Sequence, residues 1–240
     1  MFPEFHFFGQ VFHTFNLCLM PALLAVVLLA VRDCKRMRLG PAMENKVLAV
    51  IPFFVLLGIA AAVFSDWLFR KPSADSVGAT FLGWLLGAST VLAAHGVLVK
   101  IGPRFLFNFF FPSFALAQAF GRVGCFLGGC CHGRPGFFGF AFPAGSRPHA
   151  AHGDCVLYPV QLMEAAWLVV VFFLCRRCVR FERRGGAYWV LMATGRFFLE
   201  FLRGDDRGSI GGQTLLSPAQ VICLFLCAAG FWLANVNEPA

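Results

Sequence analysis

Two arginines and a glutamate lie close together in an otherwise apolar stretch near the C-terminal end of the chain. Arg196, Glu200 and Arg203 follow one another at spacings of four and three residues, which places them on one face of a helix. An ionisable side chain is costly to bury in an apolar span, so it usually faces the protein interior and pairs there. A guanidinium offers a planar fork that binds phosphate through two hydrogen bonds. The trio therefore predicts either a phosphate site or ion pairs that only hold helices together.

A second polar pair begins another apolar stretch. Gln161 and Glu164 follow Pro159, and proline is favoured at the start of a helix because its missing N–H has no partner there. The spacing of the pair puts both side chains on one helical face. Glu164 would orient an arginine or transfer a proton at a site; the alternative is a helix-end carboxylate in water.

A further arginine, Arg122, lies at the start of a glycine-rich segment earlier in the chain. Glycine lets the backbone approach a ligand closely, and free N–H groups in such a loop bind anions. We expect an outer loop here that holds a phosphate-bearing headgroup next to Arg122. The segment has neither a Walker A motif nor G-x-G-x-x-G, so it does not predict a nucleotide site. Its glycines are Gly121, Gly124, Gly128, Gly129 and Gly133.

The same region concentrates cysteines. The chain has 10 cysteines, and we expect four of them on the outer side of a membrane, where disulfides form: Cys125, Cys130, Cys131 and Cys155. We predict a disulfide between Cys155 and either Cys130 or Cys131. Nearby imidazole and carboxylate groups make a metal site conceivable, but no standard zinc spacing is present, so we predict no metal. These groups are His132, His149, His152 and Asp154.

Cys125 is the candidate reactive thiol among these cysteines, because it closely follows Arg122. A neighbouring positive charge favours the thiolate, which is the reactive form of cysteine. Cys125 would then act as a covalent acceptor or as a substitute base.

The whole chain is too apolar for a protein surrounded by water. Hydrophobic residues make up 59% of the 240 residues and charged residues only 13%, whereas about a quarter of a typical soluble domain is charged. Apolar runs long enough to cross about 30 Å of hydrocarbon predict an all-α membrane protein with about seven transmembrane helices in one domain, 1–240. The expected spans are 14–31, 47–65, 76–99, 105–121, 159–175, 185–203 and 216–236. The glycine- and cysteine-rich loop joins the fourth and fifth.

The basic residues predict the orientation of these spans. Twelve lysines and arginines fall on the side that follows the first, third and fifth spans, against seven on the other side. Cytoplasmic loops carry the excess of basic residues, so we expect the N-terminus outside and the C-terminus inside. The net charge of +8 is explained by this bias and by anionic lipid headgroups. It therefore does not predict a nucleic-acid partner.

The chain resembles the prolipoprotein diacylglyceryl transferase family of bacterial membrane enzymes, in five blocks that occur in order. The family pattern G-R-x-G-N-F-x-x-G-x-x-x-G corresponds to 121–133, and R-F-x-x-E-F-x-R corresponds to 196–203. H-P-x-Q-L-Y-E is similar to 158–164, and S-x-x-Q is similar to 217–220. Upstream, G-x-x-F-H-G-x-x-x-G is similar to Gly78, Phe81, Leu82, Gly83 and Gly87.

This resemblance implies an activity and a location. Family members sit in the bacterial plasma membrane with the site near its outer face. They move the diacylglyceryl group of phosphatidylglycerol to the lipobox cysteine thiol of a prolipoprotein and release glycerol 1-phosphate, with no cofactor. By the resemblance, Arg122 and Arg196 would hold the lipid phosphate and stabilise charge on the leaving group. The supporting residues would be Arg203, Gln161, Glu164, Glu200, Gly124 and Gly133.

The chain departs from the family pattern at residues that carry acid–base chemistry. The family histidine, a candidate base for the acceptor thiol, is Leu82; the asparagine is Cys125; and a tyrosine is Met192. A leucine cannot accept a proton. Three alternatives therefore stand beside the family reaction: another base, another acceptor, or a non-catalytic or redox-linked lipid-binding protein on the same scaffold. A transporter is less favoured, because the polar groups cluster at the outer boundary rather than at the bilayer midplane.

Overall fold

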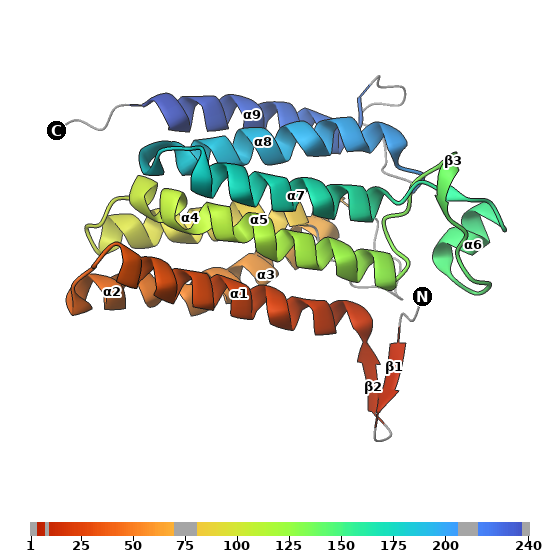
Figure 1. Ribbon diagram of the computed structural model, residues 1–240, viewed down its shortest axis with the longest axis horizontal. Helices are drawn as coiled ribbons and strands as arrows, with labels where there is room; N and C mark the ends of the chain where they lie inside the picture. Colours follow the sequence, from red (N-terminus) through yellow and green to blue (C-terminus); the bar gives the residue numbers. More distant parts are fainter. Residues whose placement is uncertain (1–3, 8–9, 70–80, 206–215, 237–240) are drawn as a thin grey trace. The chain divides into compact units, whose positions relative to one another are not determined.

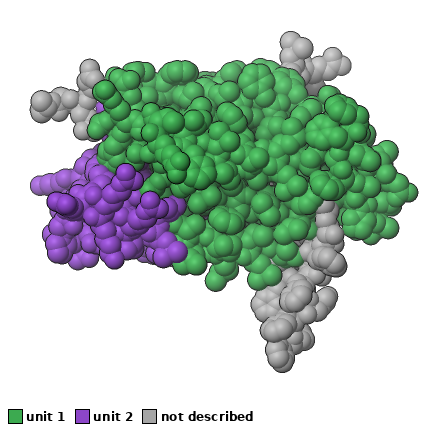
Figure 2. Space-filling model, viewed as in Figure 1, with its two compact units in different colours: residues 1–26, 111–240 green, residues 27–110 purple. Residues whose placement is uncertain are grey.

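The computed structural model describes residues 4–7, 10–69, 81–205 and 216–236. The chain forms two compact units (Figure 2): residues 1–26 with 111–240, and residues 27–110. Gly78 of the upstream family block, and the basic residues Arg70, Lys71 and Arg207, lie outside the described residues.

The first unit is built from long helices. It contains the start of α1 (Thr14–Arg36), most of α5 (Pro103–Leu127), α7 (Val160–Arg177), α8 (Arg184–Leu199) and α9 (Pro218–Asn235). A short 3-10 helix, η1 (Phe181–Arg183), precedes α8, and another, η2 (Glu200–Leu202), follows it. Helix α8 packs against both α7 and α9, and the three lie side by side (Figure 1).

Glycines allow the close approach of α8 and α9. A methyl group placed on Gly186 would meet the backbone carbonyl of Gly230, and one on Gly230 would lie 2.8 Å from the carbonyl oxygen of Gly186. Small residues at such crossings let helix backbones approach each other in a membrane protein. The pair therefore fixes how α9 lies on α8.

The sequence also fixes where α9 begins. Ser217 and Gln220 form a capping box, in which Gln220 N–H donates to Ser217 Oγ at 3.2 Å and Ser217 N–H donates to Gln220 Oε1 at 2.8 Å. These bonds satisfy N–H groups that the first turn leaves without partners, and Pro218 occupies the first helical position, which it favours. Gln220 Nε2 also donates to the Phe197 carbonyl at 3.3 Å, which ties α9 to α8.

The second unit contains the rest of α1, α2 (Pro41–Leu48), α3 (Ile51–Phe69), α4 (Phe81–Leu98) and the start of α5. Helices α3 and α4 pack together, with Gly87 so close to Ala61 that a methyl group on the glycine would overlap it. Leu82, at the position of the family histidine, lies in the first turn of α4.

Short strands were not expected from the sequence. An antiparallel hairpin, β1 (Glu4–Phe7) and β2 (Gln10–His13), precedes α1, with Glu4 opposite His13. Between α5 and α7 the chain forms β3 (Pro135–Phe140) and the short helix α6 (Arg147–His152). These strands lie outside the predicted spans, before the first span and in the predicted outer loop. Strand pairing depends on partners that periodicity within one segment does not reveal.

The described residues contain four helical stretches that are long and apolar enough to cross a membrane: Leu17–Arg36, Pro41–Ser65, Pro103–Leu127 and Pro218–Asn235. Leu82–Leu98 is apolar but shorter. Large apolar side chains point outward from these helices, among them Phe225, 71% exposed, and Trp232, 68% exposed. Such a surface is suited to lipid rather than to water, so the prediction of a mostly helical membrane protein is confirmed.

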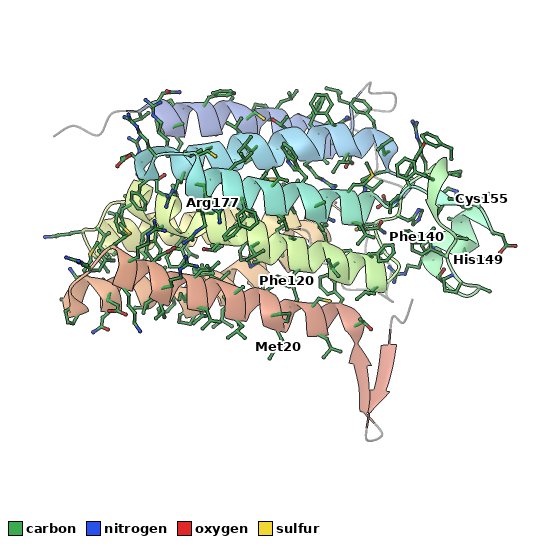
Figure 3. The ribbon with its side chains drawn as sticks, viewed as in Figure 1. Met20, Phe120, Phe140, His149, Cys155 and Arg177 are labelled. Atoms are coloured by element: carbon green, nitrogen blue, oxygen red, sulfur yellow. The ribbon has the colours of Figure 1, made fainter. Side chains whose placement is uncertain are left out.

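The two ends of α7 differ in character (Figure 3). Arg177 lies at its C-terminal end, whereas His149 and Cys155 lie beyond its N-terminal end. The arginines at 176, 177, 180, 183 and 184 belong to the first of these ends, between α7 and α8. The arginine-rich segment and the glycine- and cysteine-rich segment therefore lie at opposite ends of α7.

The α8–α9 contact can be tested by substitution. Replacing Gly186 with Ala would force its new methyl group against the Gly230 carbonyl, and overpacking of this kind costs about 1–3 kcal/mol. We expect a lower midpoint of thermal unfolding in detergent. Gly40→Ala is the matched control, since nothing lies within 4 Å of a methyl group there. Equal midpoints for the two variants would contradict the contact.

Candidate active site: a buried arginine–glutamate network

Glu164 lies at the centre of a buried ion network in the first unit. Its side chain is 2% exposed and contacts two arginines from different helices. Arg196 Nη1 of α8 donates to Glu164 Oε2 at 2.9 Å. Arg122 Nε of α5 forms an ion pair with Glu164 Oε1 at 3.0 Å, and this oxygen has no hydrogen-bond partner among the described residues. Glu164 therefore joins α5, α7 and α8 through charge.

Arg196 is held by two carboxylates. Besides its bond to Glu164, its Nη2 lies 2.9 Å from Glu200 Oε2, and Ser217 Oγ donates to Glu200 Oε1 at 3.1 Å. Of the two alternatives that the sequence left open for this trio, Arg196 and Glu200 form the ion pair, across one helical turn. Both terminal nitrogens of Arg196 are engaged by protein groups, so this guanidinium is better placed to hold the network than to grip a ligand.

Arg122 keeps its terminal nitrogens available. The residue is 8% exposed, and its ion pair within the described part of the chain is with Glu164, where the closest approach is through Nε. Nη1 and Nη2 form the face of the guanidinium that binds phosphate with two parallel hydrogen bonds. Arg122 therefore has the geometry of a phosphate ligand held in place from behind by Glu164.

Arg203 is a second buried cation with unused capacity. Its Nε and Nη2 each donate to Asp205 at 2.8 Å, while its Nη1 is buried and has no hydrogen-bond partner among the described residues. Its side chain is 2% exposed. A buried donor without a partner costs free energy, which an anionic ligand would recover.

Backbone pairing brings the segment that contains Arg203 to the segment after α5. Gly133 and Arg203 form an antiparallel bridge, with Arg134 N–H donating to the Leu202 carbonyl at 2.9 Å and Gly204 N–H donating to the His132 carbonyl at 3.0 Å. Gly133 is required here, because a side chain would overlap the Tyr158 carbonyl. The bridge sets Arg203 beside the thiol of Cys131.

Gln161 has a positioning role. Its Nε2 donates to the Cys130 carbonyl at 2.8 Å, which ties the start of α7 to the segment that follows α5. Its Oε1 is buried and accepts no hydrogen bond among the described residues. The side chain was predicted to support a lipid site; in the structure it holds the segment that follows α5.

Three cysteines gather next to these cations. The sulfur atoms of Cys125, Cys130 and Cys131 all lie within 4.8 Å of one another. Hydrogen bonds from the other two thiols, followed by the positive charges of Arg203 and Arg122, hold the pKa of Cys131 well below its usual range. Hydrogen bonds with Cys125 and Cys131, together with burial, raise the pKa of Cys130. Cys131 is therefore the member of the cluster that most readily carries negative charge.

Two sequence predictions for this region were wrong. Helix α5 continues to Leu127, so Arg122 and Cys125 lie in its last turns rather than in a loop. Gly124 packs closely against α1, since a methyl group there would lie 3.0 Å from the Cys18 side chain. The predicted disulfide to Cys155 is also absent: all ten cysteines are free, and Cys155 is exposed.

The roles of two residues at the site were missed. Asp205 fixes Arg203, and Ser217 fixes Glu200. The signal for Asp205 was an acidic side chain two residues after Arg203. Ser217 was recognised only through the family pattern. Met192, at the position of a family tyrosine, is buried in α8.

Comparison with known proteins places this site in a family. The sequence profile described as prolipoprotein diacylglyceryl transferase matches residues 4–236. The chain belongs to this family. Among similar proteins, the phosphatidylglycerol–prolipoprotein diacylglyceryl transferase 2 of Clostridium perfringens is 35% identical over 167 residues, which cover 67% of this chain and 63% of the relative. The phosphatidylglycerol–prolipoprotein diacylglyceryl transferase of Clostridium tetani is 36% identical over 131 residues, which cover 53% of this chain and 51% of the relative.

A third relative extends the match. The phosphatidylglycerol–prolipoprotein diacylglyceryl transferase of Nitratidesulfovibrio vulgaris, strain Miyazaki F, is 33% identical over 192 residues, 75% of this chain and 65% of the relative. The matched regions thus span about half to two thirds of the length of these diacylglyceryl transferases. The resemblance inferred from the sequence blocks is confirmed at the level of the family.

The central role of Glu164 generates a prediction. Glu164→Gln would leave two buried guanidiniums without their shared counter-charge, and breaking a buried ion pair in this way costs about 3–5 kcal/mol. We expect a marked fall in the thermal unfolding midpoint in detergent. Asp154→Asn is the control, because that carboxylate is 99% exposed. A midpoint for Glu164→Gln that equals the control would show that Glu164 does not hold the helices together.

Proposed function

We propose that this chain transfers the diacylglyceryl group of phosphatidylglycerol to the lipobox cysteine thiol of a prolipoprotein and releases glycerol 1-phosphate. Membership of the family and the printed names of the relatives support the reaction. The observation that carries it is Arg122, a buried guanidinium anchored through Nε with its terminal nitrogens available. We place the reaction in the bacterial plasma membrane, near the outer face.

Phosphate binding follows from the site's charges. Arg122 would donate two hydrogen bonds to the phosphate oxygens of the lipid, and Nη1 of Arg203 would supply a third donor. A buried site strengthens these contacts, because the effective dielectric constant is lower than in water. Among the phosphate ligands predicted from the sequence, Arg196 acts instead as a positioning residue, since two carboxylates already engage it.

The same groups act on the reaction. The acceptor sulfur attacks the glyceryl carbon next to the phosphate ester, the carbon–oxygen bond breaks, and its electron pair goes to the phosphate oxygen. The phosphate therefore gains negative charge as the bond breaks. Contacts that strengthen as this charge develops lower the barrier, and Glu164 contributes by keeping Arg122 in place.

We further propose that all seven predicted spans cross the membrane, with the N-terminus outside and the C-terminus inside. Helices α7 and α8 carry Glu164 and Arg196, which lowers their hydropathy. These charges are buried and paired within the protein, the condition under which ionisable residues are tolerated in a bilayer.

A second candidate function is lipid binding without transfer. Leu82 favours it, because the family histidine that would take the acceptor proton is replaced by an apolar side chain. The site would then bind phosphatidylglycerol through Arg122 and release nothing. The experiment below separates the two.

The direct test supplies purified protein with phosphatidylglycerol and a lipobox peptide and measures glycerol phosphate release and thioether formation by mass spectrometry. We expect both products from the wild type. Arg122→Ala should lower the rate by about 10²–10³-fold, the usual effect of removing one group that stabilises developing negative charge.

Arg147→Ala is the control, since Arg147 is exposed at the start of α6, and it should retain the wild-type rate. Phosphatidylglycerol binding without products from the wild type would support the lipid-binding alternative. Equal rates for Arg122→Ala and the control would contradict the phosphate role of Arg122.

A further inference from the structure

The turn after α5 brings three thiols to one point. Cys125 lies in the last turn of α5, Cys130 N–H donates to the Cys125 carbonyl at 3.0 Å, and the Cys130 carbonyl accepts from Gln161 Nε2 at 2.8 Å. Cys131 adopts a left-handed backbone conformation, φ 58°, which a residue other than glycine rarely takes. The three sulfur atoms consequently lie within 4.8 Å of one another, in a part-buried position.

This arrangement fits a thiophilic cation. Zinc–sulfur bonds of about 2.3 Å place three thiolates roughly 4 Å apart around one ion, so the sulfurs need to move by less than about 1 Å. Three soft ligands of one type select Zn²⁺ or Cu⁺ over harder ions. One Zn²⁺ with three thiolates carries a net negative charge, and the cations of Arg122 and Arg203 lie beside it. The spacing Cys-x₄-Cys-Cys matches no standard zinc motif, which is why the sequence predicted no metal.

We propose that Cys125, Cys130 and Cys131 bind one Zn²⁺, and that the open fourth position of this ion binds the acceptor cysteine as a thiolate. The second clause rests on the proposed function. Three protein ligands plus one open position are the pattern of a catalytic rather than a structural zinc site. The site would replace the base that Leu82 cannot supply.

The chemistry balances without a further reactant. Coordination to Zn²⁺ displaces the proton of the acceptor thiol into water, because a metal-bound thiol is deprotonated. The bound sulfur then attacks the glyceryl carbon of the lipid and forms the sulfur–carbon bond. The carbon–oxygen bond breaks and glycerol phosphate leaves with the electron pair beside Arg122. The thioether is a weaker ligand than a thiolate, so it leaves the zinc.

Metal binding is tested first, without reference to activity. Reduced, chelator-treated protein in detergent is titrated with Zn²⁺ and, separately, with Cd²⁺, whose bonds to thiolate absorb in the ultraviolet. We expect one equivalent bound. Cys125→Ser, Cys130→Ser and Cys131→Ser should each weaken Zn²⁺ binding by more than about 100-fold, since even residues that only support metal ligands contribute about 10–100-fold. Cys155→Ser, which changes an exposed thiol, should bind as the wild type does.

A second measurement needs no variant and therefore does not depend on the folding of one. The wild type is treated with a thiol-alkylating reagent with and without Zn²⁺, and the modified cysteines are identified by mass spectrometry. We expect Zn²⁺ to protect Cys125, Cys130 and Cys131 and to leave Cys155 reactive. The proposal would be overturned if no stoichiometric Zn²⁺ binding were found, or if the three serine variants bound Zn²⁺ as the wild type does. It would also be overturned if Zn²⁺ protected other cysteines instead, or if protein that transfers lipid held a disulfide within the cluster.

Activity separates this inference from the function on which it rests. Removal of Zn²⁺ should abolish thioether formation while phosphatidylglycerol still binds, and added Zn²⁺ should restore the reaction. Full transfer by metal-free protein would overturn the zinc role and leave the transferase function standing. Stoichiometric zinc at the three cysteines in a protein that never transfers lipid would instead refute the transferase function and the acceptor clause, and would confirm only the metal site.

Discussion

A carboxylate buried between two guanidiniums is the constraint on which this structure depends. Glu164 is 2% exposed, and a charge removed from water to that degree is tolerated only with close partners of opposite sign. Its partners come from α5 and α8, so these two helices must both contact α7 near Glu164 for its charge to be paired. Because the buried carboxylate needs a partner, the network fixes the position of Arg122. The remaining nitrogens of Arg122 are left for a ligand.

The arginines around this network have two different roles: one stabilises the contacts between helices, and the others keep donors for a ligand. Arg196 is occupied by Glu164 and Glu200 and holds the helices. Arg122 and Arg203 are each fixed by a carboxylate through part of the guanidinium and keep a donor for something else. Pre-positioned donors of this kind do not need to reorganise as charge develops on a leaving phosphate. That is the property expected of a transferase site.

Much of this was predictable from local patterns and some of it was not. The spacing of Arg196 and Glu200 made an ion pair between them one of two alternatives, because a helix places such residues in contact. The serine and glutamine that begin α9 follow a known capping pattern. The continuation of α5 through Gly121 and Gly124 was missed, because glycine-rich sequence favours a loop until packing partners are known.

The thiol cluster was missed for a different reason. Which thiols meet depends on a tight turn after α5 and on the left-handed conformation of Cys131, and neither follows from the spacing of the cysteines. The same holds for Arg203, whose position beside Cys131 comes from backbone pairing between Gly133 and Arg203. Long-range backbone pairing of this kind is set by the fold and leaves little trace in either segment alone.

In this account, the terminal nitrogens of Arg122 donate hydrogen bonds to the phosphate of a lipid headgroup, while Glu164 holds Arg122 in place through its Nε. The most direct measurement is an experimental structure of the protein in a bilayer that contains phosphatidylglycerol. The account predicts a lipid phosphate within hydrogen-bonding distance of Nη1 and Nη2 of Arg122, with the contact between Arg122 Nε and Glu164 kept. A lipid phosphate bound elsewhere, with the terminal nitrogens of Arg122 turned away from it, would contradict the account.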